Sequence, residues 1–150
     1  ALQTSQRLGL PRYETLQPGY NLMDRNGYEA ELQAVCVAQG VGVIPYYSLA
    51  SGFLSGKYRQ PEDAKGKARG ARVSTYLNER GLKVLAALDS VAARYKTTPT
   101  AVAIAWLRDR PAITAPIASA TSLEQLNDLL AGMRLALDAG AVAELDAASA

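Results

Sequence analysis

The chain has 150 residues, of which 49% are hydrophobic, with 16 Lys and Arg against 14 Asp and Glu. This length suits one domain, and a net charge of +2 is too small to indicate a nucleic-acid partner. The absence of His excludes Ser-His-Asp hydrolases, Cys-His proteases and zinc sites with His ligands. No apolar run approaches the ~20 residues that span a bilayer, so we expect a soluble cytoplasmic α/β protein with no membrane partner.

The first forty residues predict a helix, a strand and a second helix. Residues 1–9 are helix-like and end at Gly9, and because no Met precedes them we expect the chain to be a piece of something longer. Residues 13–21 begin as a strand that Pro18-Gly19 turns. From residue 27 to Gly40, apolar residues recur at helical spacing, which places the single cysteine, Cys36, on an apolar helix face as a buried structural thiol.

Residues 41–58, V-G-V-I-P-Y-Y-S-L-A-S-G-F-L-S-G-K-Y, join an expected strand to a polar loop. The β-branched residues before Pro45 suit a strand covered on both faces of a parallel sheet, and Pro45 ends the pairing. Tyr46 can then stack on a planar heterocycle, and alternation along the strand predicts that Tyr46 and Tyr47 face opposite sides. Hydroxyls, glycines and Lys57 at the carboxyl end of a strand favour a phosphate-containing ligand.

The remaining chain predicts further helices and one more strand. Residues 59–74 form a long loop, in a stretch from Lys57 to Arg80 where Lys and Arg outnumber Asp and Glu. This loop is either a solvated segment or an anion-binding flap. The later elements are a helix lying on the sheet to Tyr95, a buried helix opened by Thr98-Pro99 with Trp106 as a core anchor, a strand at 113–117, and helices at 123–133 and 138–148.

The element order is therefore β-α-β-loop-α-α-β-α-α, which favours right-handed βαβ units on a parallel sheet. Three strands leave two sheet edges unpaired, so we expect either part of a larger barrel or an obligate assembly. After the third strand, A-S-A-T-S precedes a helix that contains Glu124, Gln125 and Asp128. Helix capping by Ser122 explains this pattern, and a phosphate site at the helix start is the alternative.

Four segments in order resemble the carboxyl-terminal half of an aldo-keto reductase. They are Y-E-T-L-Q-P-G-Y-N-L-M-D-R, I-P-Y-Y-S-L-A-S-G-F-L-S-G-K-Y, T-P-T-A-V-A-I-A-W-L and I-A-S-A-T-S-L-E-Q-L-N-D-L-L. The resemblance implies one domain over residues 1–150, with no second domain. It implies an α/β fold that is the C-terminal half of a TIM (β/α)8 barrel, about strands 6 to 8 with their helices and a C-terminal helix.

The resemblance also implies a cofactor site for NADP(H), with NAD(H) as the alternative. Gln17 matches a glutamine that binds the nicotinamide carboxamide, and Tyr46 matches an aromatic residue that stacks on the nicotinamide ring. The residues that match the pyrophosphate loop are Tyr47, Leu49, Ser51, Gly52 and Lys57, with Arg72 or Arg69 from the basic flap. The residues at the adenosine end are Thr121, Gln125 and Asp128. Three positions depart from the family pattern: the usual proline is replaced within Y-Y-S-L, Ser122 replaces a basic residue, and Leu129 replaces an adenine-contacting asparagine.

The family's catalytic Asp, Tyr, Lys and His all lie in the amino-terminal half, so this chain carries no catalytic residue of that set. The first hypothesis is therefore a fragment of an NADP(H)-dependent carbonyl reductase, inactive alone, whose partner is the missing N-terminal half-barrel. The second is a non-catalytic half-barrel that binds a nucleotide or another protein and self-associates through its sheet edges. The third is an α/β domain without a ligand.

Overall fold

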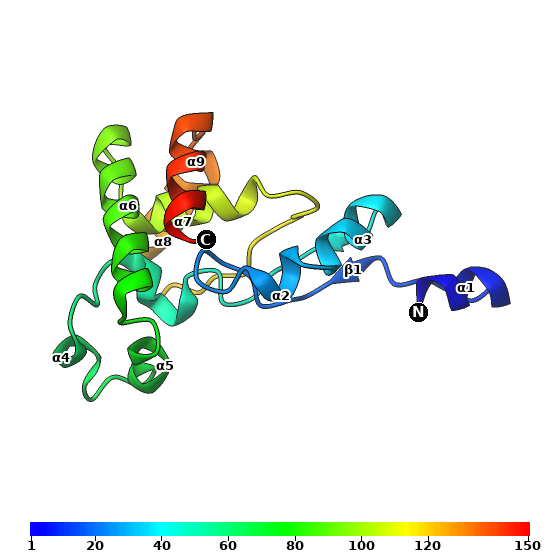
Figure 1. Cartoon of the computed structure of the whole chain (residues 1–150), viewed down its shortest axis with the longest axis horizontal. Helices are drawn as coiled ribbons and strands as arrows, with labels where there is room; N and C mark the ends of the chain where they lie inside the picture. The colour runs from blue at the N-terminus through cyan, green and yellow to red at the C-terminus, as the bar shows by residue number, and fades with distance from the viewer.

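A computed structural model describes all residues, 1–150. The molecule is elongated: α1 projects from one end, and α6, α7, α8 and α9 gather at the other (Figure 1). The elements, in chain order, are α1 (Leu2–Leu8), β1 (Thr15–Leu16), α2 (Asn26–Glu29), α3 (Leu32–Gln39), β2 (Gly42–Val43), the 3-10 helix η1 (Ala50–Ser55), α4 (Pro61–Ala64), α5 (Gly70–Ser74), α6 (Glu79–Tyr95), α7 (Pro99–Arg108), α8 (Leu123–Arg134) and α9 (Ala139–Ala148).

The sheet is small and parallel, as the sequence predicts. Strand β1 pairs with β2 in the register Thr15 to Gly42 and Leu16 to Val43. The predicted third strand pairs on the other side of β2 through one bridge, Val43 to Ile113, and the Thr114 N–H donates to the Val43 carbonyl at 2.8 Å. The chain is therefore α/β with segments aligned in the order β1, β2, 113–117, although the third segment makes too few ladder bonds to form a full strand.

Helix α7 lies at the centre of the helical body, where it packs against α6, α8 and η1. Its N-cap is Thr98, whose hydroxyl accepts from the Ala101 N–H at 3.2 Å, with Pro99 in the first turn. Trp106 is fully buried, as expected of a core anchor. The prediction that α6 lies on the sheet is wrong, because α6 packs on α7 and α9 and leaves Leu82 of its apolar stripe 46% exposed.

Three local predictions are also wrong. The helix expected over residues 27–40 is two helices, because Glu31 has a non-helical backbone (φ −137°, ψ −43°) between α2 and α3. The loop expected over residues 59–74 contains α4 and α5, which its weak periodicity did not indicate. Pro18-Gly19 does not turn the chain, because Gly19 continues the parallel pairing with Tyr46; the bend follows at residues 21–24.

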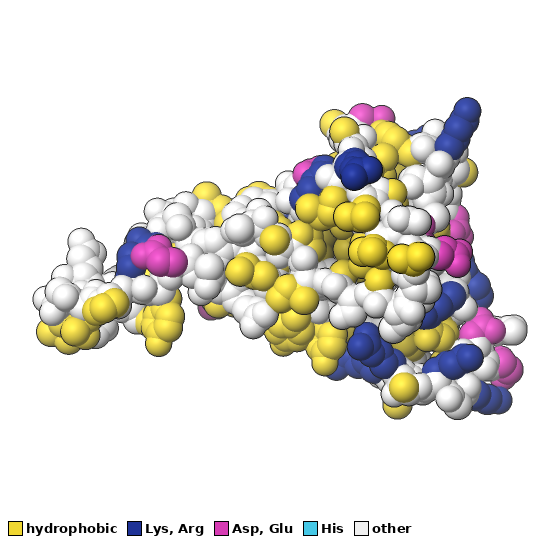
Figure 2. Space-filling model, turned by 180° about the vertical axis from the view of Figure 1, so that it is seen from behind, with side chains coloured by type: hydrophobic (Ala, Val, Ile, Leu, Met, Phe, Trp, Pro, Cys, Tyr) yellow, Lys and Arg dark blue, Asp and Glu magenta, His cyan; other side chains and the backbone are white.

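The two faces of β2 have different surroundings. Val41 and Val43 are buried against the helices, but Gly42 and Ile44, which alternate with them, are only partly covered. The prediction of a strand covered on both faces is therefore wrong within this chain. Apolar side chains are also exposed on the helices: Leu32 and Val35 on α3 and a stripe on α8. Figure 2 shows such side chains on the back of the molecule.

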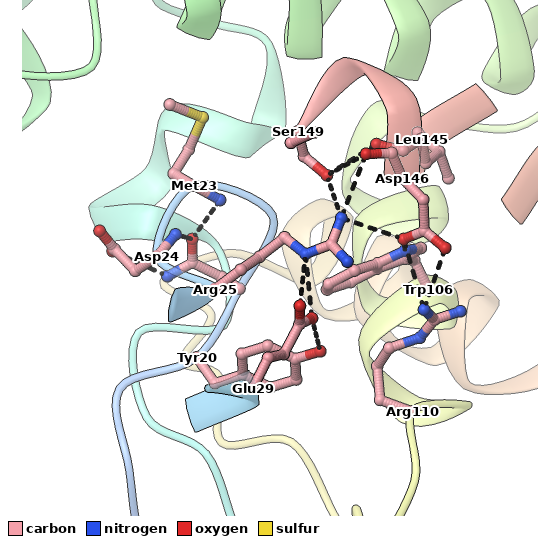
Figure 3. Close-up of polar contacts among 12 residues, drawn as sticks. Tyr20, Met23, Asp24, Arg25, Glu29, Trp106, Arg110, Leu145, Asp146 and Ser149 are labelled. Atoms are coloured by element: carbon pink, nitrogen blue, oxygen red, sulfur yellow. Dashed lines mark hydrogen bonds and ion pairs between the residues drawn. The ribbon is translucent and has the colours of Figure 1, made fainter. Parts of the chain in front are cut away.

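A polar cluster, which we call the Asp146 clamp, fastens α9 to the bend after β1 (Figure 3). Its members are Tyr20, Arg25, Glu29, Trp106, Arg110, Asp146 and Ser149. Asp146 accepts from the Trp106 indole at 3.0 Å and pairs with Arg25 and Arg110, each at 3.2 Å. Burial raises the pKa of Tyr20 far above its usual range, so its hydroxyl remains a donor to Glu29 at 2.6 Å.

The structure contains no helix with the length and apolar character that a membrane span requires.

Candidate functional site

The site begins with the tyrosine pair that follows β2. The Tyr46 ring lies over Gly19, where an added Cβ would come within 3.3 Å of the ring, a tight contact that glycine avoids. The Tyr46 and Tyr47 rings meet edge to face with centroids 4.8 Å apart, and both side chains are more than 40% exposed. The expectation that they face opposite sides is wrong, because Tyr47 has a left-handed backbone (φ 58°) and leaves the strand alternation.

The backbone after the tyrosines is strained and presents free donors. Ala50, Ser51 and Gly52 are consecutive residues with positive φ values of 47°, 59° and 94°. Strain of this kind in non-glycine residues is characteristic of ligand-binding segments. The N–H groups of Tyr47, Ser48 and Leu49 donate no hydrogen bond within the protein. Unpaired consecutive amides of this type can bind an anion.

Lys57 brings a positive charge to this strained segment. A Cβ built on Gly52 would contact the Lys57 Nζ at 3.6 Å, so the ammonium lies directly beside the Gly52 backbone. The same Nζ lies 5.1 Å from the centroid of the Tyr58 ring, a cation–π distance. Lys57 forms no ion pair with an acidic side chain, and its charge therefore remains available to an anionic ligand.

A second cation, Arg72, reaches the tyrosines from α5. Its Cζ lies 5.8 Å from the centroids of both the Tyr47 and Tyr76 rings. Its Nε donates to the Tyr76 hydroxyl at 3.3 Å, and its nearest carboxylate, Asp24, is 4.0 Å away. Arg72 therefore lies against the tyrosines, whereas Arg69 is the N-cap residue of α5. Figure 2 shows basic side chains around this α4–α5 region.

The loops after β2 and after the third paired segment are fastened together. Ser48 is 2% exposed, and its hydroxyl donates to the Ile117 carbonyl at 2.7 Å. The Ile117 N–H donates in turn to the Pro45 carbonyl at 2.9 Å. Because the strands are parallel, both loops leave the same edge of the sheet. The two polar segments predicted from the sequence therefore begin side by side.

The segment before α8 forms the helix cap that the sequence predicts. The Ser122 hydroxyl accepts from the Gln125 N–H at 3.2 Å, and the Gln125 side chain accepts from the Thr121 N–H at 3.0 Å. Glu124 lies in the first turn and places a negative charge near the helix start. Capping is confirmed, while a phosphate at this position stays a prediction.

Seven of the eleven predicted site residues fall into three groups of contacting residues. In the first group, Tyr47 contacts both Tyr46 and Arg72. In the other two groups, Gly52 contacts Lys57 and Thr121 contacts Gln125. Ser51 is almost buried at 8% exposure, and Leu49 packs partly against the core. Gln17 is exposed and Asp128 half-buried, and neither side chain makes a hydrogen bond.

Sequence reasoning missed the residues that hold these groups in place. Asn21 is 1% exposed and donates to the Tyr47 carbonyl at 3.0 Å, which fixes the left-handed turn. Asp24 accepts from the Tyr76 hydroxyl at 2.7 Å and from Asn21 at 3.1 Å. One signal was present in the sequence: Asn21 and Asp24 are polar residues within the apolar run Y-N-L-M-D, a spacing typical of an Asx turn.

Comparison with known proteins identifies the family of this chain. The family model described as "Aldo/keto reductase family" matches residues 5–150. "Protein tas" of Escherichia coli (strain K12) is 30% identical over 149 residues, which are 97% of this chain and 42% of that protein. "L-glyceraldehyde 3-phosphate reductase" of Escherichia coli O157:H7 is 31% identical over 75% of this chain and 34% of that protein.

A third relative, "Aldo-keto reductase" of Babesia bovis, is 30% identical over 131 residues, which are 83% of this chain and 46% of that protein. The chain thus spans less than half the length of each of these relatives. The family fold is a (β/α)8 barrel, and the parallel, helix-rich structure is consistent with part of one. Because the family model covers nearly the whole sequence, this chain belongs to the aldo/keto reductase family.

Proposed function

We propose that this chain is the cofactor-binding portion, residues 1–150, of an NADP(H)-dependent aldo-keto reductase that interconverts carbonyl compounds and alcohols. The observation that carries the proposal is the loop after β2. There an exposed Tyr46 ring lies over Gly19, and the Lys57 ammonium lies beside the strained backbone at Gly52. A planar ring, a cation and free amides in one loop fit a dinucleotide, which has an aromatic ring and phosphates.

The residues of the chain fit the parts of the cofactor. Tyr46 would support the nicotinamide ring, and the exposed amide of Gln17 would bind its carboxamide. Lys57, Arg72 and the free amides of Tyr47, Ser48 and Leu49 would bind the pyrophosphate. Thr121, Gln125 and Asp128 would lie at the adenosine end. When bound, the cofactor supplies the hydride that the reaction transfers.

The length of the relatives and the exposed surfaces of this chain support the interpretation that the chain is a fragment of a larger barrel. The matched residues are less than half of each relative's length, and both outer edges of the parallel sheet are unpaired here. The β2 face that carries Gly42 and Ile44 is only partly covered, and the α8 stripe is exposed. In this proposal, an amino-terminal half-barrel covers these surfaces and supplies the catalytic residues. A native polypeptide of only 150 residues, measured by intact mass in the source cells, would contradict it.

The binding part of the proposal is tested by titrating the chain with NADPH and following cofactor fluorescence. Lys57→Ala should weaken binding about tenfold, because it removes one charge-assisted contact. Lys83→Ala is the matched control, since Lys83 is an exposed α6 lysine whose ion pair with Glu79 lies outside the site. A parallel titration with NADH measures the preference for the 2′-phosphate. Failure of the unmodified chain to give a saturable signal would overturn the proposal.

Self-association is the second candidate function, and the exposed α8 stripe favours it. Leu123, Leu126, Leu130 and Met133 recur at helical spacing and are each at least 42% exposed. A second copy of the chain could cover this stripe, and the assembly would act as a nucleotide-binding or interaction module without catalysis. Sedimentation of the chain at micromolar concentration tests this candidate. A stable monomer would contradict it, whereas a dimer that Leu126→Glu dissociates would support it.

A further inference from the structure

The group of side chains that holds Arg72 has no role in the cofactor site described above. Tyr76 is 6% exposed, and its ring packs on Phe53 of η1 with centroids 5.5 Å apart. Its hydroxyl group makes the polar contacts, which are with Asp24 and Arg72. Tyr76 thus joins the strained loop, the bend after β1 and the α5 arginine in one place.

The hydrogen bonds in this group run in one direction. The Arg72 Nε donates to the Tyr76 oxygen at 3.3 Å, and the Tyr76 hydroxyl donates to the Asp24 Oδ2 at 2.7 Å. Burial and the bond to Asp24 both raise the pKa of Tyr76, so the phenol stays protonated and can donate at neutral pH. A phenol oxygen that both accepts and donates in this way fixes its two neighbours relative to each other.

Arg72 itself keeps most of its hydrogen-bonding capacity free. Its side chain is 54% exposed, and only the Nε has an acceptor within the protein. The 4.0 Å separation between the Arg72 guanidinium and Asp24 is too long for a hydrogen bond. The Nε of Arg72 is therefore held by the Tyr76 hydroxyl, while the N–H groups of its two terminal nitrogens are free to bind a phosphate.

We infer that Tyr76 and Asp24 are positioning residues, which hold Arg72 beside Tyr47 so that its free N–H groups meet the pyrophosphate of the cofactor. This inference rests on the proposed function of the loop. Neither residue touches the cofactor; Tyr76 acts through Arg72, and Asp24 acts through Tyr76. Asn21 supports the same arrangement, because it contacts both Asp24 and the Tyr47 carbonyl.

A double-mutant cycle on the full chain tests the inference, with NADPH as the probe. Tyr76→Phe keeps the ring packing on Phe53 and removes only the hydroxyl. We expect it to raise the Kd about five- to tenfold, the effect of losing one hydrogen bond to a charged group. In an Arg72→Ala background the same change should alter the Kd less than about twofold, because the group to be positioned is absent. Far-UV circular dichroism and thermal unfolding establish that each variant is folded.

Three further variants make the test specific. Tyr95→Phe is the matched control for Tyr76→Phe, because Tyr95 also donates to a carboxylate, Asp138, at 2.7 Å but lies between α6 and α9. Arg94→Ala is the control for Arg72→Ala, since Arg94 is similarly exposed at 51% and pairs with Glu144. Neither control should change the Kd. Asp24→Asn keeps an acceptor for the Tyr76 hydroxyl and should bind NADPH within about threefold of the unmodified chain.

The outcomes separate the inference from the proposed function. If the unmodified chain binds NADPH but Tyr76→Phe weakens binding equally with and without Arg72, Tyr76 has only a structural effect and the inference is overturned. An Asp24→Asn Kd as high as that of Tyr76→Phe would also overturn it. If the unmodified chain does not bind NADPH, the proposed function fails and the inference fails with it. Coupling confined to the Tyr76–Arg72 pair would support both.

Discussion

Helices α7 and α8 pack against each other, yet they differ in what covers them. Residues 101–107 of α7 are all buried, whereas α8 buries only Gly132. The Gly132 backbone lies so close to α7 that an added Cβ would meet the Ala101 carbonyl at 2.8 Å. The contact between the two helices is therefore tight, and the apolar stripe on the outer side of α8 has no partner in the chain. The buried residues of α7 therefore stabilise the fold, whereas the apolar stripe on α8 remains exposed.

The largest expected difference between the two helices comes from the same substitution on each. Leu107→Ala on α7 removes a fully buried side chain and should cost about 3 kcal/mol of unfolding free energy. Leu130→Ala on α8 removes one that is 43% exposed and should cost less than about 1 kcal/mol. Urea denaturation measures both values. An equally large loss for Leu130→Ala would mean that a second copy covers the stripe.

The Asp146 clamp should contribute more than an exposed ion pair on the same helix. Asp146→Asn keeps a possible acceptor for the Trp106 indole but removes the charge that Arg25 and Arg110 share, and those arginine side chains are only 19% and 16% exposed. We expect a loss of about 2 kcal/mol in urea denaturation. Glu144→Gln breaks the more exposed pair with Arg94 and should cost less than about 1 kcal/mol. Equal losses would show that the clamp adds nothing beyond a surface pair.

The smallest expected effect is a fall in the unfolding free energy at high pH, caused by ionisation of Tyr28. Burial raises the pKa of Tyr28 to about 12, and its hydroxyl donates to the Pro111 carbonyl at 3.0 Å. The phenol ionises near pH 10 in the unfolded chain, so its contribution to stability is complete below about pH 10 and is lost as the pH rises through about 12. Between pH 9 and 11 the loss is on the order of 1 kcal/mol. Tyr28→Phe should reduce the fall in unfolding free energy over this range; an unchanged fall would contradict the assignment.

The sequence by itself determined features that depend on neighbouring residues. The caps at Thr98 and Ser122 lie where the sequence places them, because each cap bond reaches only three residues along the chain. Gly9 and Gly40 end their helices in left-handed conformations, as a residue without a Cβ allows. The parallel order of the strands was also predictable, since alternating strand and helix patterns favour βαβ connections.

Only the tertiary structure decided how the candidate site is assembled. Tyr47 takes its left-handed conformation beside Asn21, which is 26 residues away in sequence, and Tyr76 meets Asp24 across 52 residues. No local pattern encodes such pairs, and the position of Arg72 against Tyr47 and Tyr76 depends on them. The sequence predicted that some surface would lack a partner, and the structure shows that it lies on β2 and α8. Apolar periodicity predicts which side chains need a partner, whereas the folded chain shows which of them find one.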